Sequence, residues 1–71
     1  MSEQVDARGL SCPQPVVITC KKMEKIGKGT IEVLVDAAAS RDNIKRMAIN
    51  QGWQVEIQEK EDEFLLIITK S

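Results

Sequence analysis

Apolar and polar residues alternate in four short stretches of the chain and recur at helical spacing in two longer ones. Alternation puts every second side chain on one face and predicts a strand, whereas apolar residues three and four positions apart predict an amphipathic helix. The predicted elements, in chain order, are a strand at residues 4–8, a helix at 13–26, a strand at 30–36, a helix from an N-cap at Ser40 to residue 51, and strands at 53–58 and 64–69. The charged residues 60–63 predict the last turn.

This order of elements, βαβαββ, predicts the fold. Right-handed crossovers make the first three strands parallel and put both helices on one face of the sheet. A hairpin makes the last strand antiparallel to its neighbour. Because the last strand, FLLII, is apolar on both sides, we expect it between the second and third strands. The prediction is an α+β protein, a two-layer α/β sandwich with a four-stranded mixed sheet in the order 1-2-4-3, and residues 1–71 form one domain.

One face of this sheet has no helix over it. Leu34 must point to that face, together with either Leu65 and Ile67 or the set Phe64, Leu66 and Ile68. A contiguous apolar patch there would mark an interface. Scattered aliphatic side chains on an open sheet face are also common, and both interpretations remain open.

Composition excludes several classes of function. Apolar residues make up 42% and charged residues 30% of the chain, and the net charge of −1 gives no reason to expect binding to nucleic acid or membrane. The sequence shows no signal-peptide pattern, and its longest apolar run, residues 64–68, is too short to span a bilayer, so we expect a cytoplasmic protein. With two cysteines and no histidine, we expect no metal site, no cofactor and no Cys–His nucleophile pair.

The stretch CPQP predicts a helix start that carries a cysteine. Cys12 fits the N-cap, Pro13 the first helical position, and Pro15 is still tolerated in the first turn, where an N–H has no helical acceptor. The N–H of Gln14 is then the natural donor to the Cys12 sulfur. The helix dipole and this donor should lower the pKa of the Cys12 thiol. The alternative is a purely structural N-cap; Cys20, on the apolar side of the helix, is expected to be a small hydrophobe.

The signature DxxGLxCPxP resembles that of the TusA/SirA-like sulfur-carrier family, and within it the YedF-like branch. It is carried here by Asp6, Gly9, Leu10, Cys12, Pro13 and Pro15. The resemblance implies the βαβαββ sandwich and a persulfide on Cys12, received from a cysteine desulfurase or a rhodanese-like donor. It also implies transfer to an acceptor protein, in tRNA thiolation or related sulfur or selenium metabolism. Asp6 and Gly9 would fix the approach loop, Asp6 by binding loop N–H groups and Gly9 by a positive φ or by letting a partner come close. The chain would act with partner enzymes rather than as an enzyme by itself.

Basic residues offer candidate docking contacts. They are Arg8, Lys21, Lys25 and Arg41, which would guide an acidic partner, although a solvated helix face accounts for such lysines equally well. Arg8 and Arg41 are expected near Cys12, where they would also lower the pKa of its thiol. Two rival functions remain. One is a small binding or regulatory module, and the other is an RNA-binding domain, for which the chain has few aromatic stacking residues.

Overall fold

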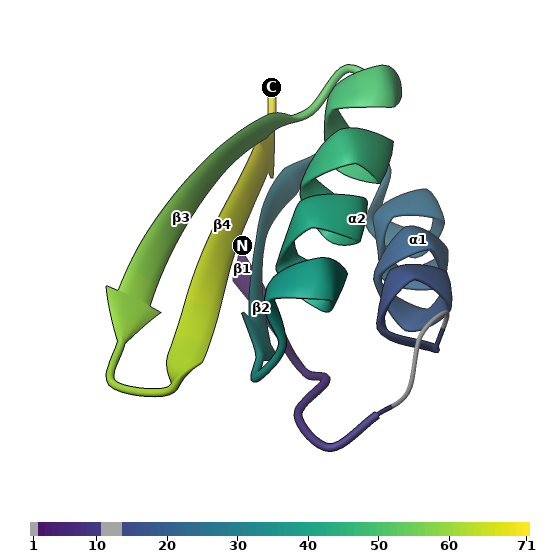
Figure 1. Cartoon of the computed structure of the whole chain (residues 1–71). Helices are drawn as coiled ribbons and strands as arrows, with labels where there is room; N and C mark the ends of the chain where they lie inside the picture. The colour runs from purple at the N-terminus through teal and green to yellow at the C-terminus, as the bar shows by residue number, and fades with distance from the viewer. Residues whose placement is uncertain (1, 11–13) are drawn as a thin grey trace.

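The chain forms four strands and two helices in the predicted order (Figure 1). The structure is a computed structural model and describes residues 2–10 and 14–71. The elements are β1 (Ser2–Asp6), α1 (Gln14–Ile26), β2 (Gly29–Val35), α2 (Ala38–Asn50), β3 (Gln54–Lys60) and β4 (Glu63–Lys70). Among the described residues, neither α1 nor α2 has the length and hydropathy of a membrane-spanning helix.

The sheet has the predicted order β1-β2-β4-β3. β1 runs parallel to β2, and β4 runs antiparallel to both of its neighbours. β4 takes a central place because its apolar residues can be covered on the helix side while its backbone pairs on both edges. Its residue Leu66, for example, is paired with Val33 of β2 and with Ile57 of β3.

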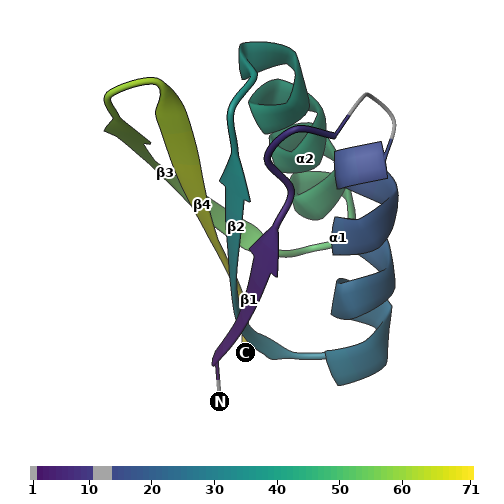
Figure 2. The ribbon, with the colours of Figure 1, turned by 90° about the horizontal axis from the view of Figure 1, so that it is seen from below.

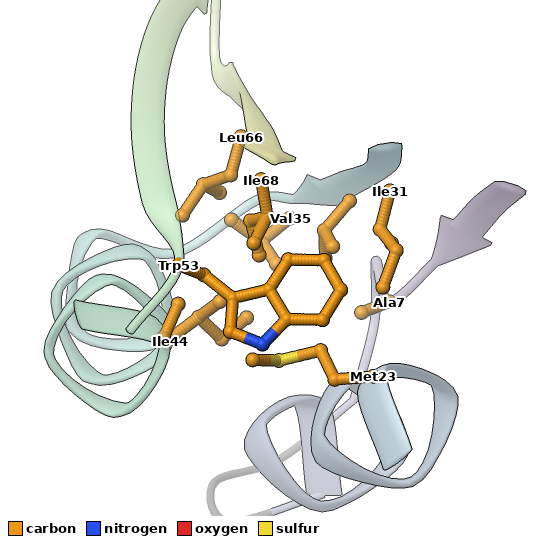
Figure 3. Close-up of a cluster of buried hydrophobic side chains, with 10 residues drawn as sticks. Ala7, Met23, Ile31, Val35, Ile44, Trp53, Leu66 and Ile68 are labelled. Atoms are coloured by element: carbon orange, nitrogen blue, oxygen red, sulfur yellow. The ribbon is translucent and has the colours of Figure 1, made fainter. Parts of the chain in front are cut away.

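Both helices pack on the same face of the sheet (Figure 2), as predicted. The core between the two layers consists of Ala7, Met23, Ile31, Val33, Val35, Ile44, Ala48, Trp53, Leu66 and Ile68. Figure 3 shows the indole of Trp53 among these side chains, next to the thioether of Met23. Trp53 is only 5% exposed, and its backbone N–H donates to the carbonyl oxygen of Ala48 at 2.9 Å. The predicted third strand begins at this residue, whereas β3 begins one residue later.

The N-cap predicted at Ser40 is wrong. Ala37 occupies the N-cap position with extended backbone angles, φ −132° and ψ 136°, and contributes no side-chain hydrogen bond. Two alanines, which favour helix strongly, follow it and let α2 begin directly after the short connection from β2. Ser40 therefore lies inside α2, where it is buried and 4% exposed.

All four predicted strands differ from the observed strands by one or two residues at their ends, and β2, for example, spans Gly29–Val35 rather than residues 30–36. β1 ends at Asp6 rather than at Arg8, although the N–H of Ala7 still donates to the carbonyl oxygen of Leu34 at 2.8 Å. β3 and β4 extend toward each other until only Glu61 and Asp62 connect them. Glu61 has a positive φ of 48°, the backbone geometry that tight two-residue hairpins favour.

Candidate functional site

The connection from β1 to α1 lies at the edge of the sheet where β1 and β2 end and where both helices begin (Figure 2). Cys12 and Pro13 belong to this connection but lie outside the described residues. The predicted N-cap role of Cys12, the role of Pro13 at the helix start, and the donor role of the Gln14 N–H toward Cys12 therefore remain predictions. The structure does show the residues that hold both ends of this segment.

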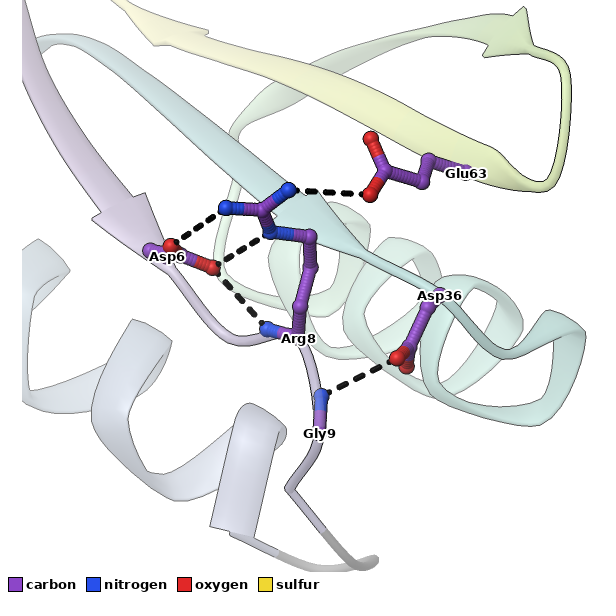
Figure 4. A network of polar contacts seen from close by, with 5 residues as sticks. All are labelled: Asp6, Arg8, Gly9, Asp36 and Glu63. Atoms are coloured by element: carbon purple, nitrogen blue, oxygen red, sulfur yellow. Dashed lines mark hydrogen bonds and ion pairs between the residues drawn. The ribbon is translucent and has the colours of Figure 1, made fainter.

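An ion-pair network holds the N-terminal side of the connection (Figure 4). The Oδ1 atom of Asp6 accepts hydrogen bonds from the backbone N–H of Arg8 at 3.1 Å and from its Nε at 3.0 Å. The Nη2 atom of Arg8 donates to Oδ2 of Asp6 at 3.0 Å, and Nη1 donates to Oε2 of Glu63 at 2.9 Å. Asp6 thus binds a loop N–H, as predicted, and Arg8 links the end of β1 to the start of β4.

A second contact fixes Gly9. Its N–H donates to Oδ2 of Asp36, which follows β2, at 3.0 Å. Gly9 has a φ of 75°, in the left-handed region that glycine adopts without strain. A Cβ atom added at Gly9 would meet nothing within 4 Å. The positive φ, and not a lack of space for a side chain, therefore favours glycine at this position. The sequence predicts this positive φ as one of two roles for Gly9, but it does not predict the role of Asp36.

Apolar residues of the signature anchor the connection on the core. Leu10 packs against the buried cluster, and the side chain of Pro15 is fully buried in the first turn of α1. The hydroxyl of Thr19 donates to the carbonyl oxygen of Pro15 at 2.7 Å, within the same helix. Gln14, between these anchors, is exposed. The described residues on either side of residues 11–13 therefore pack on the core, Leu10 partly buried and Pro15 fully buried.

The charges at this edge are mostly negative. Asp6, Asp36 and Glu63 line an open depression of about 530 Å³ together with Arg8 and Gly9. Hydrogen bonds from Arg8, together with its charge, hold the pKa of Asp6 at about 2, below its ordinary value of 3.8. The same hydrogen bonds to Asp6 and Glu63 raise the pKa of Arg8. No group of three potential metal ligands occurs among residues 2–10 and 14–71.

Arg8 and Arg41 both lie at this edge, but neither is an isolated positive charge. Arg8 is shared by two carboxylates, as described above. Arg41, in the first turn of α2, pairs with Asp42 at 2.9 Å and Glu59 at 3.8 Å, and its guanidinium lies 4.6 Å from the ring centre of Phe64. Its hydrogen bond to Asp42 raises the pKa of Arg41. An effect of these arginines on the Cys12 thiol stays a prediction, and their pairing would weaken it.

The other predicted docking residues lie elsewhere. Lys21 and Lys25 are exposed on α1, seven and eleven residues beyond its start, which puts them about 10 and 16 Å along the helix axis. The predicted docking residues therefore do not form one surface.

Cys20 is half-buried, and its sulfur has polar as well as apolar neighbours. Its sulfur accepts from Nε2 of Gln51 at 3.5 Å and lies 3.5 Å from Oε1 of Glu24. Cys20 is therefore not the simple apolar residue that the sequence predicts.

Comparisons with known proteins agree with this architecture. The family model described as "Sulfurtransferase TusA" matches residues 3–70. Proteins named "Putative sulfur carrier protein" from Methanocaldococcus jannaschii and Archaeoglobus fulgidus are each 37% identical over 70 residues. These matches cover 96% of this chain and 93% and 91% of the relatives. The crystal structure of the SirA-like protein from Desulfitobacterium hafniense is 35% identical, with a TM-score of 0.92, and the match covers 100% of this chain and 99% of that one.

Proposed function

The chain belongs to the TusA sulfurtransferase family, and on this premise we propose that Cys12 carries sulfur as a persulfide between two partner proteins. The observation that carries the proposal is the family match over residues 3–70, which includes the whole signature around Cys12. The anchors at Leu10 and Pro15 support it, since a carrier must present its cysteine at a fixed place on the surface.

The reaction is an exchange between sulfur atoms. The thiolate of Cys12 attacks the terminal sulfur of a persulfide on the donor, the donor's S–S bond breaks, and the donor cysteine leaves as a thiolate. The product is a persulfide on Cys12, so no external oxidant or reductant is consumed. An acceptor thiolate then takes the terminal sulfur in the same way. This chemistry needs an accessible thiolate but no general base, which suits a chain without histidine.

The partners follow from this role. We propose a cysteine desulfurase or a rhodanese-like protein as the donor, and a sulfur-acceptor protein in tRNA thiolation or related sulfur or selenium metabolism. The carrier would work in the cytoplasm, where thiols stay reduced. It would need no metal or cofactor of its own, and its partners would supply the remaining catalytic groups.

The test is mass spectrometry of the full chain after incubation with a cysteine desulfurase and cysteine, without reductant. We expect one added sulfur atom on the peptide that contains Cys12, removed by dithiothreitol. Cys20→Ser is the matched control and should load normally, whereas Cys12→Ser should not load. No added sulfur with any of several desulfurases and rhodanese-like donors would refute the proposal and favour a binding module with a structural cysteine. Loading on Cys20 would refute the assignment of the site.

A further inference from the structure

The face of the sheet opposite the helices is open to solvent (Figures 1 and 2). Side chains on a strand alternate between its two faces. Since Val33, Val35, Leu66 and Ile68 are buried on the helix side, the residues that alternate with them along each strand point to the open face. These are Glu32 and Leu34 of β2 and Leu65 and Ile67 of β4. Of the two sets that the sequence allows on this face, the structure therefore places Leu65 and Ile67 there, and not the set Phe64, Leu66 and Ile68.

The open face has an apolar centre. Leu34 pairs directly with Leu65, and Ile67 pairs with Glu32 in the same ladder. All three aliphatic side chains are only partly covered. A hollow of about 300 Å³ lies here, lined in part by Gln4, Asp6, Glu32, Leu34, Lys60 and Leu65. A hollow of this kind has room for one aliphatic side chain of another protein.

Glu32 gives this surface its chemical preference. It is half-buried on a central strand, between Gln4 of β1 and Ile67 of β4. It forms no ion pair with any residue in the described part of the chain. A partner that covered Glu32 would remove its carboxylate from water, which is unfavourable unless the partner supplies a cation. The geometry therefore favours an occupant with an arginine or lysine beside its aliphatic side chain.

The charges around the centre mostly have the same sign. The strand registers put four carboxylates on the open face, from Asp6, Glu32, Glu56 and Glu63, against one amine, from Lys60. Arg8 compensates part of this charge through Asp6 and Glu63. Two copies of this face would therefore repel each other, which argues against a dimer formed through it. A basic partner is attracted instead.

We propose that the open face, centred on Glu32, Leu34 and Leu65, is a docking surface for a partner protein that presents an aliphatic side chain next to an arginine or lysine. Asp6 lines both this hollow and the depression at the end of β1, so a partner bound here reaches the edge where the Cys12 connection begins. This inference concerns the sheet alone and would hold even if Cys12 carried no sulfur.

The test is an NMR titration of the full chain, labelled with ¹⁵N, with short peptides of defined pattern at low salt. The probe alternates leucine and arginine; the controls alternate leucine with glutamate and serine with arginine. We expect the leucine–arginine peptide to shift the amide signals of Glu32, Leu34 and Leu65 and to bind more weakly as salt is added. We expect both control peptides to bind at least about tenfold more weakly, since each lacks one of the two features.

Variants of the chain test whether the open face is where the peptide binds. Glu32→Lys should weaken binding of the leucine–arginine peptide by about tenfold or more, and Glu32→Gln by less. Lys45→Glu, on the solvent side of α2, should leave binding unchanged or strengthen it slightly. No shifts at about 1 mM peptide, shifts centred on the helices, or equal binding of the leucine–glutamate peptide would each overturn the proposal. So would concentration-dependent dimerisation, in sedimentation, that Glu32→Lys abolishes.

Discussion

Leu65 and Leu66 are adjacent leucines on β4 that should respond very differently to the same substitution. Leu66 is 0% exposed and lies under the helices, whereas Leu65 lies half-covered on the open face. Replacing either by alanine removes the same atoms from the same strand. The pair therefore isolates burial from strand propensity and from any effect on the unfolded chain.

The expected magnitudes differ by several-fold. A fully buried leucine truncated to alanine costs about 3–5 kcal/mol, because the lost transfer free energy adds to that of the cavity left behind. Truncating a half-covered leucine to alanine leaves no closed cavity and lowers the free energy of unfolding by about 1 kcal/mol. A domain of this length has a free energy of unfolding of about 4–10 kcal/mol. Leu66→Ala should thus remove a large share of the total stability, and Leu65→Ala a small one.

The assay is urea unfolding followed by the fluorescence of Trp53, the single tryptophan, which is buried in the core. If the free energy of unfolding falls by about 1 kcal/mol per molar urea, Leu66→Ala should lower the urea midpoint by about 3–5 M or leave the chain unfolded without urea. Leu65→Ala should lower the midpoint by about 1 M. Equal losses in the two variants, or a larger loss for Leu65→Ala, would refute the assignment of the two faces.

Three further predictions concern the connection to α1 and the helix itself. Gly9→Ala should lower the free energy of unfolding by about 1–2 kcal/mol, because alanine resists a φ of 75°; an unchanged urea midpoint would contradict this. The pKa of Asp6 is lowered to about 2 in the folded chain. The ionised carboxylate therefore adds to the free energy of unfolding above about pH 4, and this stabilisation is lost as the pH falls toward 2. Urea midpoints of Asp6→Asn should fall less steeply than those of the parent chain over this range, and parallel curves would exclude the effect. Thr19→Val should cost about 1 kcal/mol in thermal unfolding, because it removes a buried hydrogen bond to Pro15; a gain in stability would show that this bond contributes nothing.

Much of the fold could be predicted because the patterns that decide it are local. Alternation and helical spacing identified all six elements, and the apolar strand FLLII required a place inside the sheet. The N-cap of α2 could not be predicted in this way. Capping preference favours Ser40, but the short connection from β2 to α2 let the helix begin at Ala38 instead.

The same limit applies to the candidate site, where a contact between near neighbours could be predicted and contacts between distant residues could not. The contact between Asp6 and Arg8 joins residues two positions apart, and a role for Asp6 in binding loop N–H groups is predicted from the signature. The contacts of Gly9 with Asp36 and of Arg8 with Glu63 join residues 27 and 55 positions apart. Neither pairing can be predicted from local spacing, because each forms only once β2 has paired with β1 and β4 has paired with β2. For the same reason the sequence does not reveal that two carboxylates share Arg8.

The central position of β4 also governs when this protein can fold. β4 is synthesised after every other element, yet it pairs with β2 on one side and β3 on the other. Until it arrives, β3 has no partner strand, and one edge of β2 stays unpaired. Residues 63–70 must therefore be synthesised before the sheet can close, so the residues that precede β4 are not expected to form this sheet by themselves. Nascent chains that stop before this strand would expose an open edge and apolar surface, the features that chaperones and proteases recognise.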